Sequence, residues 1–337
     1  MSARLGSSAI ASQLLGRTTL PVMGAPMFIG STAALVIAQC SAGIIGAVPA
    51  LNARSTQQLD EMLYEIEEGL AAHDKLHPET PAAPYGLNLV AHASNNRLDA
   101  DLAVLLAHRV PLAVIALGAP AELVQAVHGY GGLIFNDIIS TRHARKCAEA
   151  GVDGLIAVCA GAGGHTGNVS PFALVQEIRE FWDGPLALSG CIANGRGILA
   201  AQAMGADFAY IGSAFLATHE ANTESAFKQM IVDCSAQDVT VTNCFTGVNA
   251  TFLRPSIIAN GLDPATLVRP EGSKINIADG GSNTKAWRDI WSAGQGVGGI
   301  HHIEPAGDYI ARLQREYDVA KTALRRVTTS RPSADAM

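Results

Sequence analysis

The chain has 337 residues, of which 48% are hydrophobic and only 5% aromatic, and its formal net charge at pH 7 is −7. This size and composition allow a large core and favour closely packed helices and sheets over an aromatic-rich sandwich. The acidic balance and the lack of any basic block exclude the electrostatic footprint of a nucleic-acid-binding protein.

Three features of the sequence indicate where in the cell the protein works: its six cysteines, its N-terminus and its apolar segments. No two cysteines form a C-x-x-C pair or stand at zinc spacing from a histidine, so we interpret them as reduced thiols. The first 20 residues make a poor signal peptide. Every apolar run is well short of the roughly 18 residues that a membrane span needs. We therefore expect a cytoplasmic protein with no membrane partner and no metal site.

Eight short apolar runs recur between Thr19 and Ser213, and most are followed by a loop and then by a helical pattern. The runs lack the polar–apolar alternation of a half-exposed sheet, which is typical of parallel strands that are buried on both faces. The expected strands are residues 20–27, 43–50, 85–90, 112–118, 132–138, 153–160, 185–190 and 208–213.

Capping residues mark the helices between these strands. Ser31 as N-cap predicts one helix, and Asn95 or Asn96 predicts the start of another. Ser170 followed by Pro171 predicts a third. Eight strands alternating with helices over about 200 residues predict an α/β fold, the (β/α)8 or TIM barrel, with an open doubly wound sheet as the alternative.

The regular pattern ends after Ser213. We expect a helix within 220–234, an amphipathic helix that ends at Gly294, and a long closing helix over 306–327. GQGVGG (294–299) has the spacing of a dinucleotide fingerprint, but it follows a helix instead of a strand, so we interpret it as a turn. The predicted organisation is an N-terminal extension (1–18), a barrel (19–218), a C-terminal helical cap or lid with the closing helix packed on the barrel (219–327) and a flexible tail (328–337).

Catalytic groups of such a barrel lie at the C-terminal ends of its strands, and phosphate is often held by the loops after the seventh and eighth strands. Those loops are residues 188–197 and 210–215, and both offer glycines whose backbone N–H groups can face an anion. The first loop also leads into a helix N-terminus, which attracts phosphate. Ordinary chain reversal explains either loop alone, but two such loops side by side indicate a phosphate-bearing ligand.

Polar side chains at the strand ends complete the candidate site. His165 stands beside Gly163, Gly164 and Gly167, and it is the one histidine that we place in a strand-end loop. Imidazole suits proton transfer or hydrogen bonding to a developing anion. A hydrogen-bonded structural histidine is the alternative, but the glycine-rich loop favours a catalytic role. The other candidates are Asn88, Asn136, Asp137, Ser189 and Ser213.

Five segments, in order, resemble the nitronate monooxygenase family, once called 2-nitropropane dioxygenases. They are PVMGAPM, YGLNL, AGAGGHTG, LSGCIANGRG and GADFAYIGSAFLATHEA. Related flavin barrels include FMN-dependent enoyl reductases and NADH:quinone reductases. The resemblance spans the predicted barrel, extends to IWSAGQGVGG, and implies an FMN-dependent oxidoreductase.

The resemblance also implies roles for residues of this chain. His165 would be the catalytic residue. The FMN phosphate would be held by Ser189, Gly190, Cys191, Gly212 and Ser213; the isoalloxazine ring would lie along Ala25, Pro26 and Met27, with Asn88 at its polar edge and Gly163 and Gly164 close to the ring.

Two positions depart from the family pattern. Asp137 stands where many members carry a lysine that favours an anionic reduced flavin, and Cys191 replaces the second glycine of an S-G-G sequence. We include both residues among those expected to bind the cofactor.

Three functions remain open from the sequence. We expect a nitronate monooxygenase that oxidises nitronates or nitroalkanes with O₂. The second is an NAD(P)H-dependent FMN reductase that acts on a quinone, an enone or an enoyl thioester, and the third is a flavin-free barrel that binds a phosphorylated metabolite. The expected partners are these small molecules, with no nucleic acid, and a homo-oligomer remains open.

Overall fold

Eight parallel strands form one sheet that closes into a barrel. The structure is a computed structural model that describes residues 7–267 and 287–329. The strands are β1 (Val22–Gly24), β2 (Gly46–Pro49), β3 (Tyr85–Val90), β4 (Leu112–Ala116), β5 (Leu133–Ile138), β6 (Gly154–Val158), β7 (Leu186–Ser189) and β8 (Phe208–Ile211).

The strand order confirms the TIM barrel. From β2 to β8 each strand pairs with the next one along the chain, and β8 pairs with β1. A parallel bridge between Met23 and Ile45 joins β1 to β2. The alternative of an open doubly wound sheet is excluded, because such a sheet keeps two unpaired edges.

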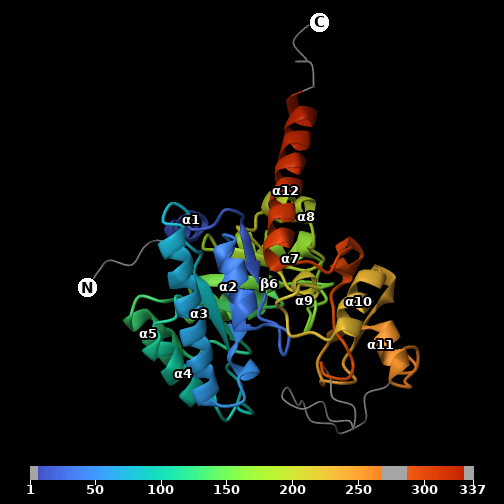
Figure 1. Cartoon of the computed structure of the whole chain (residues 1–337), viewed down its shortest axis with the longest axis horizontal. Helices are drawn as coiled ribbons and strands as arrows, with labels where there is room; N and C mark the ends of the chain where they lie inside the picture. Colours follow the sequence, from blue (N-terminus) through green and yellow to red (C-terminus); the bar gives the residue numbers. More distant parts are fainter. Residues whose placement is uncertain (1–6, 268–286, 330–337) are drawn as a thin grey trace, which may run out of the picture.

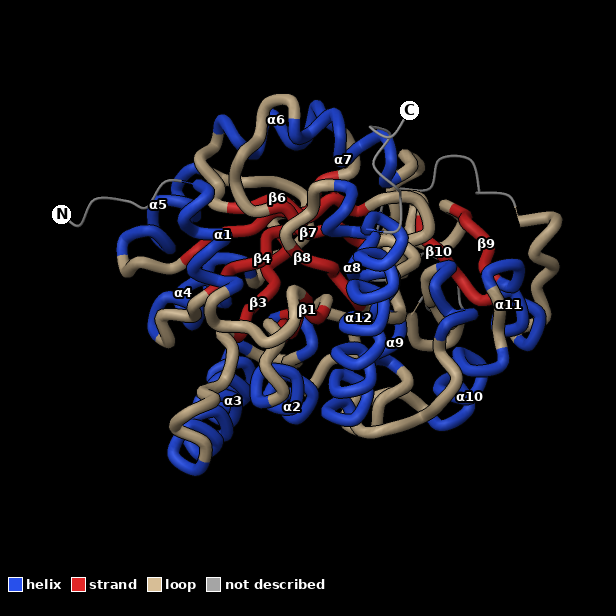
Figure 2. The backbone as a smooth tube through the Cα atoms, turned by 90° about the horizontal axis from the view of Figure 1, so that it is seen from above, coloured by secondary structure: helices blue, strands red, loops and turns tan. Residues whose placement is uncertain are grey.

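Helices surround the strands, and a small hairpin lies to one side with α10 and α11 (Figure 2). The helices are α1 (Ser7–Leu15), α2 (Ala33–Ser41), α3 (Thr56–Leu76), α4 (Leu98–Ala107), α5 (Ala121–Gly129), α6 (Thr141–Glu149), α7 (Pro171–Arg179), α8 (Gly195–Met204), α9 (Ser213–Leu216), α10 (Ser225–Asp233), α11 (Arg254–Ala259) and α12 (Ala306–Thr329). The hairpin is β9 (Val239–Thr242) with β10 (Ala250–Leu253), and short 3-10 helices are η1 (Ala50–Asn52), η2 (Ala236–Asp238) and η3 (Gln295–Gly299). Among the described helices, none is long and apolar enough to cross a membrane.

The barrel is closed at one end and accessible at the other. Ile10 and Leu14 of α1 belong to the same apolar cluster as Leu112 and Leu133, the first residues of β4 and β5. At the opposite end, β3, β4, β6 and β7 each finish on a half-buried residue after a run of buried ones. We call this C-terminal end, with the loops that follow the strands, the mouth. The barrel is thus less tightly closed at this end.

The long helix α12 occupies the place of the eighth helix of the ring. It packs against α8 and α2, and it runs beside α8 in Figure 1. Gly195 N donates to Glu316 Oε2 (2.9 Å), and the Tyr309 hydroxyl donates to the carbonyl of Ala193 (3.1 Å). The chain between β8 and α12 is therefore an insertion into the barrel pattern. The boundary at 218/219 remains a prediction.

Several local expectations were wrong. Thr32, one residue after the predicted Ser31, caps α2 and accepts from Leu35 N (3.0 Å). Helix α4 begins only at Leu98, because Asn95 Oδ1 accepts from Arg97 N (3.1 Å) in a turn before it.

The helix expected to end at Gly294 is also absent over 287–294. Trp287 has a φ of +70°, which a right-handed helix does not allow. The expected helix begins at residue 284, and its first three residues, 284–286, lie outside the described part of the chain. Residues 330–337 of the predicted tail lie outside it too. Residues 328 and 329, also assigned to the tail, end α12.

Gly195 is a point of close contact between α8 and α12. A Cβ atom there would overlap the backbone N of Tyr317 and lie 2.5 Å from the carbonyl carbon of Glu316. We expect Gly195→Ala to lower the free energy of unfolding by about 1–3 kcal/mol, because the two helices must separate. Chemical denaturation measures this.

Gly307→Ala on α12 is the control, because a Cβ there meets nothing within 4 Å. It should leave stability unchanged or raise it by up to about 1 kcal/mol. Equal unfolding midpoints for the two variants would contradict the close contact.

Candidate functional site

The loop after β1 lies against the end of β8. Ala25 N donates to the carbonyl of Ile211 (2.8 Å). A Cβ on Gly212 would lie 3.3 Å from the Cβ of Ala25 and 3.7 Å from the Sδ of Met27. The structure therefore brings Ala25, Met27 and Gly212 together at one side of the mouth, with Pro26 between the first two.

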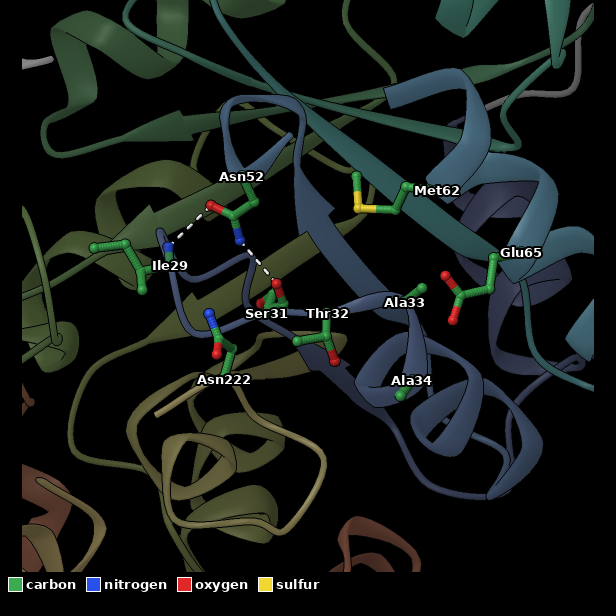
Figure 3. Close-up of a pocket in the computed structure, with 9 residues that line it drawn as sticks. All are labelled: Ile29, Ser31, Thr32, Ala33, Ala34, Asn52, Met62, Glu65 and Asn222. Carbon is green, nitrogen blue, oxygen red and sulfur yellow. Dashed lines mark hydrogen bonds between the residues drawn. The ribbon is translucent and has the colours of Figure 1, made fainter. Parts of the chain in front are cut away.

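Asn52 holds this loop in place (Figure 3). Its Nδ2 donates to the carbonyls of Met27 (3.0 Å) and Ser31 (2.8 Å), and its Oδ1 accepts from Ile29 N (2.9 Å). A pocket of about 340 Å³ lies beside the loop and is lined by residues such as Asn52 and Met62. None of the residues expected to bind the cofactor lines it, so this pocket is separate from the predicted site.

The loops after β6 and β8 meet at Gly294. Gly294 N donates to the Oγ of Ser213 (2.8 Å), and a Cβ on Gly163 would lie 2.8 Å from that Oγ. A Cβ on Gly294 would lie 2.6 Å from the carbonyl O of Gly161 and 2.7 Å from the N of Gly163. The segment that we interpreted as a turn thus begins where it touches two strand-end loops.

The loop after β7 turns at Gly190 and Cys191, whose φ angles are +137° and +60°. The second value is uncommon for a non-glycine residue, and such conformations cluster at ligand sites. Cys159 N donates to the carbonyl of Ser189 (3.0 Å), which ties this loop to the β6 side of the mouth. A Cβ on Gly296 would lie 3.0 Å from the carbonyl carbon of Cys191, so the 294–299 segment contacts this loop as well.

The N-terminus of α8 is already occupied by groups of the protein. Gly195 N donates to the Glu316 carboxylate, and Gly197 N donates to the Oδ1 of the N-cap Asn194 (2.9 Å). A carboxylate at a helix N-terminus takes up both the donor and the favourable dipole. We therefore correct the expectation that this helix end attracts phosphate. The loop residues at 189–191 and 212–213 are the remaining candidates.

Asn88 and Asp137 lie on the inner face of the barrel. Side chains alternate along a strand, and Phe135, two residues before Asp137, belongs to the interior cluster. Asn88 Nδ2 donates to the carbonyl of Val114 (3.0 Å), which uses one of the two amide donors. The Oδ1 of Asp137 is buried with no hydrogen-bond partner in the described structure, and burial raises the pKa of this carboxyl to about 7.

The side chain of the candidate Asn136 points the opposite way, towards the surrounding helices, and the residue is 1% exposed. Tyr210 is an inner-face residue that our sequence reasoning missed. Its hydroxyl is also buried without a partner in the described structure. The alternation within β8 would have found it, since Phe208 is in the interior cluster too.

His165 lies in the β6 loop, against the hairpin. Its backbone forms a bridge to Ala250 of β10, and its ring makes an edge-to-face contact with Trp287, with 5.4 Å between the ring centroids. Nε2 is buried with no hydrogen-bond partner in the described structure, and burial lowers the pKa of the imidazole. A neutral imidazole can accept a proton at one ring nitrogen.

Two further residues support this loop and were not found from the sequence. Gly164 N donates to the Oγ of Ser292 (3.0 Å), and Trp287 packs against the His165 ring. We also correct the statement that His165 is the one histidine in a strand-end loop. His92 follows β3 closely, and its Nδ1 lies 2.8 Å from the Oγ of Ser94.

If the mouth binds FMN, as the resemblance implies, we expect Gly294→Ala to weaken that binding at least about tenfold, because the added methyl group must displace the β6 loop. Fluorescence quenching of FMN titrated with apoprotein measures the Kd. Gly298→Ala is the matched control within the same segment, since its Cβ would lie 3.9 Å from the nearest atoms. Unchanged affinity in Gly294→Ala would show that this contact does not set the shape of the mouth.

Comparisons with known proteins agree with the fold and identify the family. The family model for nitronate monooxygenase matches residues 12–316. Rv1533 of Mycobacterium tuberculosis, which is named as a monooxygenase, is 32% identical over 242 residues, which cover 67% of this chain and 64% of that protein. A nitronate monooxygenase of Paraburkholderia phytofirmans is 27% identical over 340 residues, which cover 88% of this chain and 92% of that protein.

A third relative carries a different activity in its name. It is a Rhodococcus jostii dehydrogenase of a hydroxy-methyl-oxo-octahydro-indene-carboxyl-CoA, 29% identical over 224 residues, covering 66% of this chain and 60% of that protein. The chain thus spans just under two thirds of the first and third relatives. The solved nitroalkane oxidase of Streptomyces ansochromogenes superposes with a TM-score of 0.76 at 25% identity, covering 92% of this chain and 99% of that one. With the closed barrel, the converging loops and a family match over nearly the whole chain, this protein belongs to the nitronate monooxygenase family of oxidoreductases.

Proposed function

We propose that this chain is an FMN-dependent oxidoreductase that oxidises nitronates or nitroalkanes with O₂ as the electron acceptor. One observation carries the proposal: the β6, β7 and β8 loops converge at the accessible end of the barrel, and the β6 loop carries His165 with a buried, unpartnered Nε2. Membership of the family supports the reaction class.

The loops after β7 and β8 would hold the FMN phosphate. Ser189, Gly190 and Cys191 turn sharply there, which lets successive backbone N–H groups face one anion. Gly212 and Ser213 would complete the site. Gly294 N uses only an acceptor position of the Ser213 hydroxyl, so the O–H of Ser213 is still available as a donor to phosphate.

The loop after β1 and the β6 loop would hold the isoalloxazine ring between them. Ala25, Pro26 and Met27 would lie along it, and Gly163 and Gly164 would let the backbone approach it. Asn88 and Asp137 would face its polar edge from the inner face of the barrel. The buried, unpartnered Oδ1 of Asp137 and Nε2 of His165 fit a bound group with hydrogen-bonding atoms. Bound FMN would supply the redox chemistry.

His165 would act as a general base. Burial lowers its pKa, so the ring is neutral at pH 7 and can accept a proton at Nε2. It would take the α-proton of a neutral nitroalkane or hydrogen-bond the oxygens of a nitronate. The edge-to-face contact with Trp287 would restrict the rotation of the ring and keep that nitrogen oriented.

We expect His165→Ala to lower kcat/KM for a neutral nitroalkane by about 10²–10⁴-fold, with a smaller loss for the preformed nitronate, which has no proton to give up. Steady-state kinetics with both substrates measure the difference. His92→Ala, which removes the other histidine close to a strand end, is the control and should behave as wild type. Equal losses for both substrates would argue against a base.

The acid limb of the pH profile provides a second readout. Because the pKa of His165 is lowered, kcat/KM for the nitroalkane should fall only below about pH 6.5, the ordinary value for histidine. An acid limb that starts above this pH would assign the base to another group.

Asp137 favours a second candidate function, an NAD(P)H-dependent FMN reductase or dehydrogenase acting on a quinone, an enone or an enoyl thioester. An acidic side chain in place of lysine gives no fixed positive charge to stabilise an anionic reduced cofactor, and one relative is named as a CoA-ester dehydrogenase. His165 would then donate a proton after hydride transfer from its imidazolium form, which the lowered pKa of the ring disfavours at pH 7.

An absorbance spectrum and anaerobic titrations separate these candidates. Bleaching of the flavin bands by a nitronate supports the first function, and bleaching by NADH or NADPH supports the second. A colourless protein that takes up no FMN would favour a flavin-free barrel that binds a phosphorylated metabolite.

A further inference from the structure

Asp137 and Tyr210 both direct a polar side chain to the inner face of the barrel. The Oδ1 of Asp137 and the hydroxyl of Tyr210 are both buried without a hydrogen-bond partner in the described structure. Each stands two residues after a phenylalanine of the interior cluster, so both lie on the mouth side of that apolar layer. The charge of Asp137 contributes to raising the pKa of Tyr210, so the two groups lie within electrostatic reach of each other. Buried polar atoms of this kind indicate a missing partner.

Asp137 is the only acidic or basic residue in β1–β8. The strands that flank it, β4 and β6, contain no titratable side chain. The titratable groups that respond to its charge are Tyr210 of β8 and Cys147 of α6. Both are neutral at pH 7, because burial raises their pKa values, that of Cys147 to about 11. Among the residues that the structure describes, no cation therefore balances a carboxylate here, in agreement with the raised pKa of Asp137, about 7.

We propose that Asp137 serves as a neutral carboxylic acid that donates a hydrogen bond from the inner face of the barrel to the polar edge of bound FMN, with the Tyr210 hydroxyl as a second donor beside it. The inference rests on the proposed FMN site. A protonated carboxyl group has an O–H donor, whereas a carboxylate has only acceptor oxygens. A carboxylate would turn lone pairs and an uncompensated charge towards the carbonyl oxygens of the ring.

This arrangement makes FMN binding depend on one proton. The carboxyl of the free protein is protonated below its pKa of about 7 and ionised above it. If only the neutral form donates to FMN, affinity is full below that pKa and falls by about tenfold for each pH unit above it. A fixed lysine at the same place would give no such dependence.

The test is the Kd of FMN for full-length apoprotein, measured by quenching of flavin fluorescence from about pH 6.5 to about pH 8.5. Wild type should weaken by about tenfold per pH unit at the upper end of this range. Asp137→Asn keeps a neutral donor, so it should bind within about threefold of wild type at the lower end and show no pH dependence. Asp137→Leu has no donor and should bind about tenfold more weakly than Asp137→Asn.

Two further variants sharpen the comparison. Asp99→Asn removes an exposed carboxylate from α4, outside the barrel, and should keep the wild-type pH dependence. Tyr210→Phe removes the second donor and should weaken binding by about 3–10-fold at every pH without changing the slope. Circular dichroism verifies that each variant is folded. If one variant is not, the pH dependence of the wild-type Kd still tests the proposal.

The outcomes separate this inference from the proposed function. A pH-independent Kd in wild type, a wild-type slope in Asp137→Asn, or equal affinities of Asp137→Asn and Asp137→Leu would each overturn the neutral acid and leave the FMN site standing. Failure of wild type to bind FMN at any pH would overturn both proposals.

Discussion

The backbone contact between Gly294 and the β6 loop is the constraint on which the shape of the mouth depends. The loops of a TIM barrel follow separate strands, and nothing in the strand ladder alone fixes their mutual positions. Here one segment, far along the chain, touches Gly161 and Gly163 after β6 and bonds to Ser213 after β8. The same segment contacts the β7 loop at Cys191 through Gly296. The segment that contains Gly294 and Gly296 thus contacts the loops after β6, β7 and β8.

The insertion that delivers this segment also explains the position of α12. Because the hairpin and α10–α11 come between β8 and its helix, the ring of helices is completed only when α12 packs against α8 and α2. The same stretch of chain therefore contacts the loops of the mouth and leads into the helix that closes the ring. A change in the insertion would therefore alter the positions of both the mouth loops and α12.

Burial gives the mouth its chemical character. Desolvation disfavours the charged form of any group, so it lowers the pKa of His165 and raises that of Asp137. The two groups have opposite ordinary charges, yet both are driven towards neutrality near pH 7. The mouth therefore carries a neutral imidazole in one loop and a protonatable carboxyl group on the inner face. A barrel of this kind hosts several reactions, and such local differences decide between them.

The sequence by itself determined the elements whose signals are local. All eight strands were predicted, because apolar runs without alternation follow from burial on both faces, and the closing helix was placed at 306–327 against Ala306–Thr329 in the structure. The glycine-rich loops and the place of His165 in one of them could be predicted because they directly follow predicted strands, whereas their roles in a site stay predictions.

Only the tertiary structure decided what depends on contacts between distant segments. In the folded chain, Glu316 accepts a hydrogen bond at the N-terminus of α8, the β9–β10 hairpin lies against the His165 loop, and Gly294 contacts Gly163. Asp137 and Tyr210, 73 positions apart in the sequence, come within electrostatic reach of each other because the sheet closes and turns both towards one interior. Periodicity reports which face of an element is buried, whereas the partner on that face is selected by packing across the whole fold.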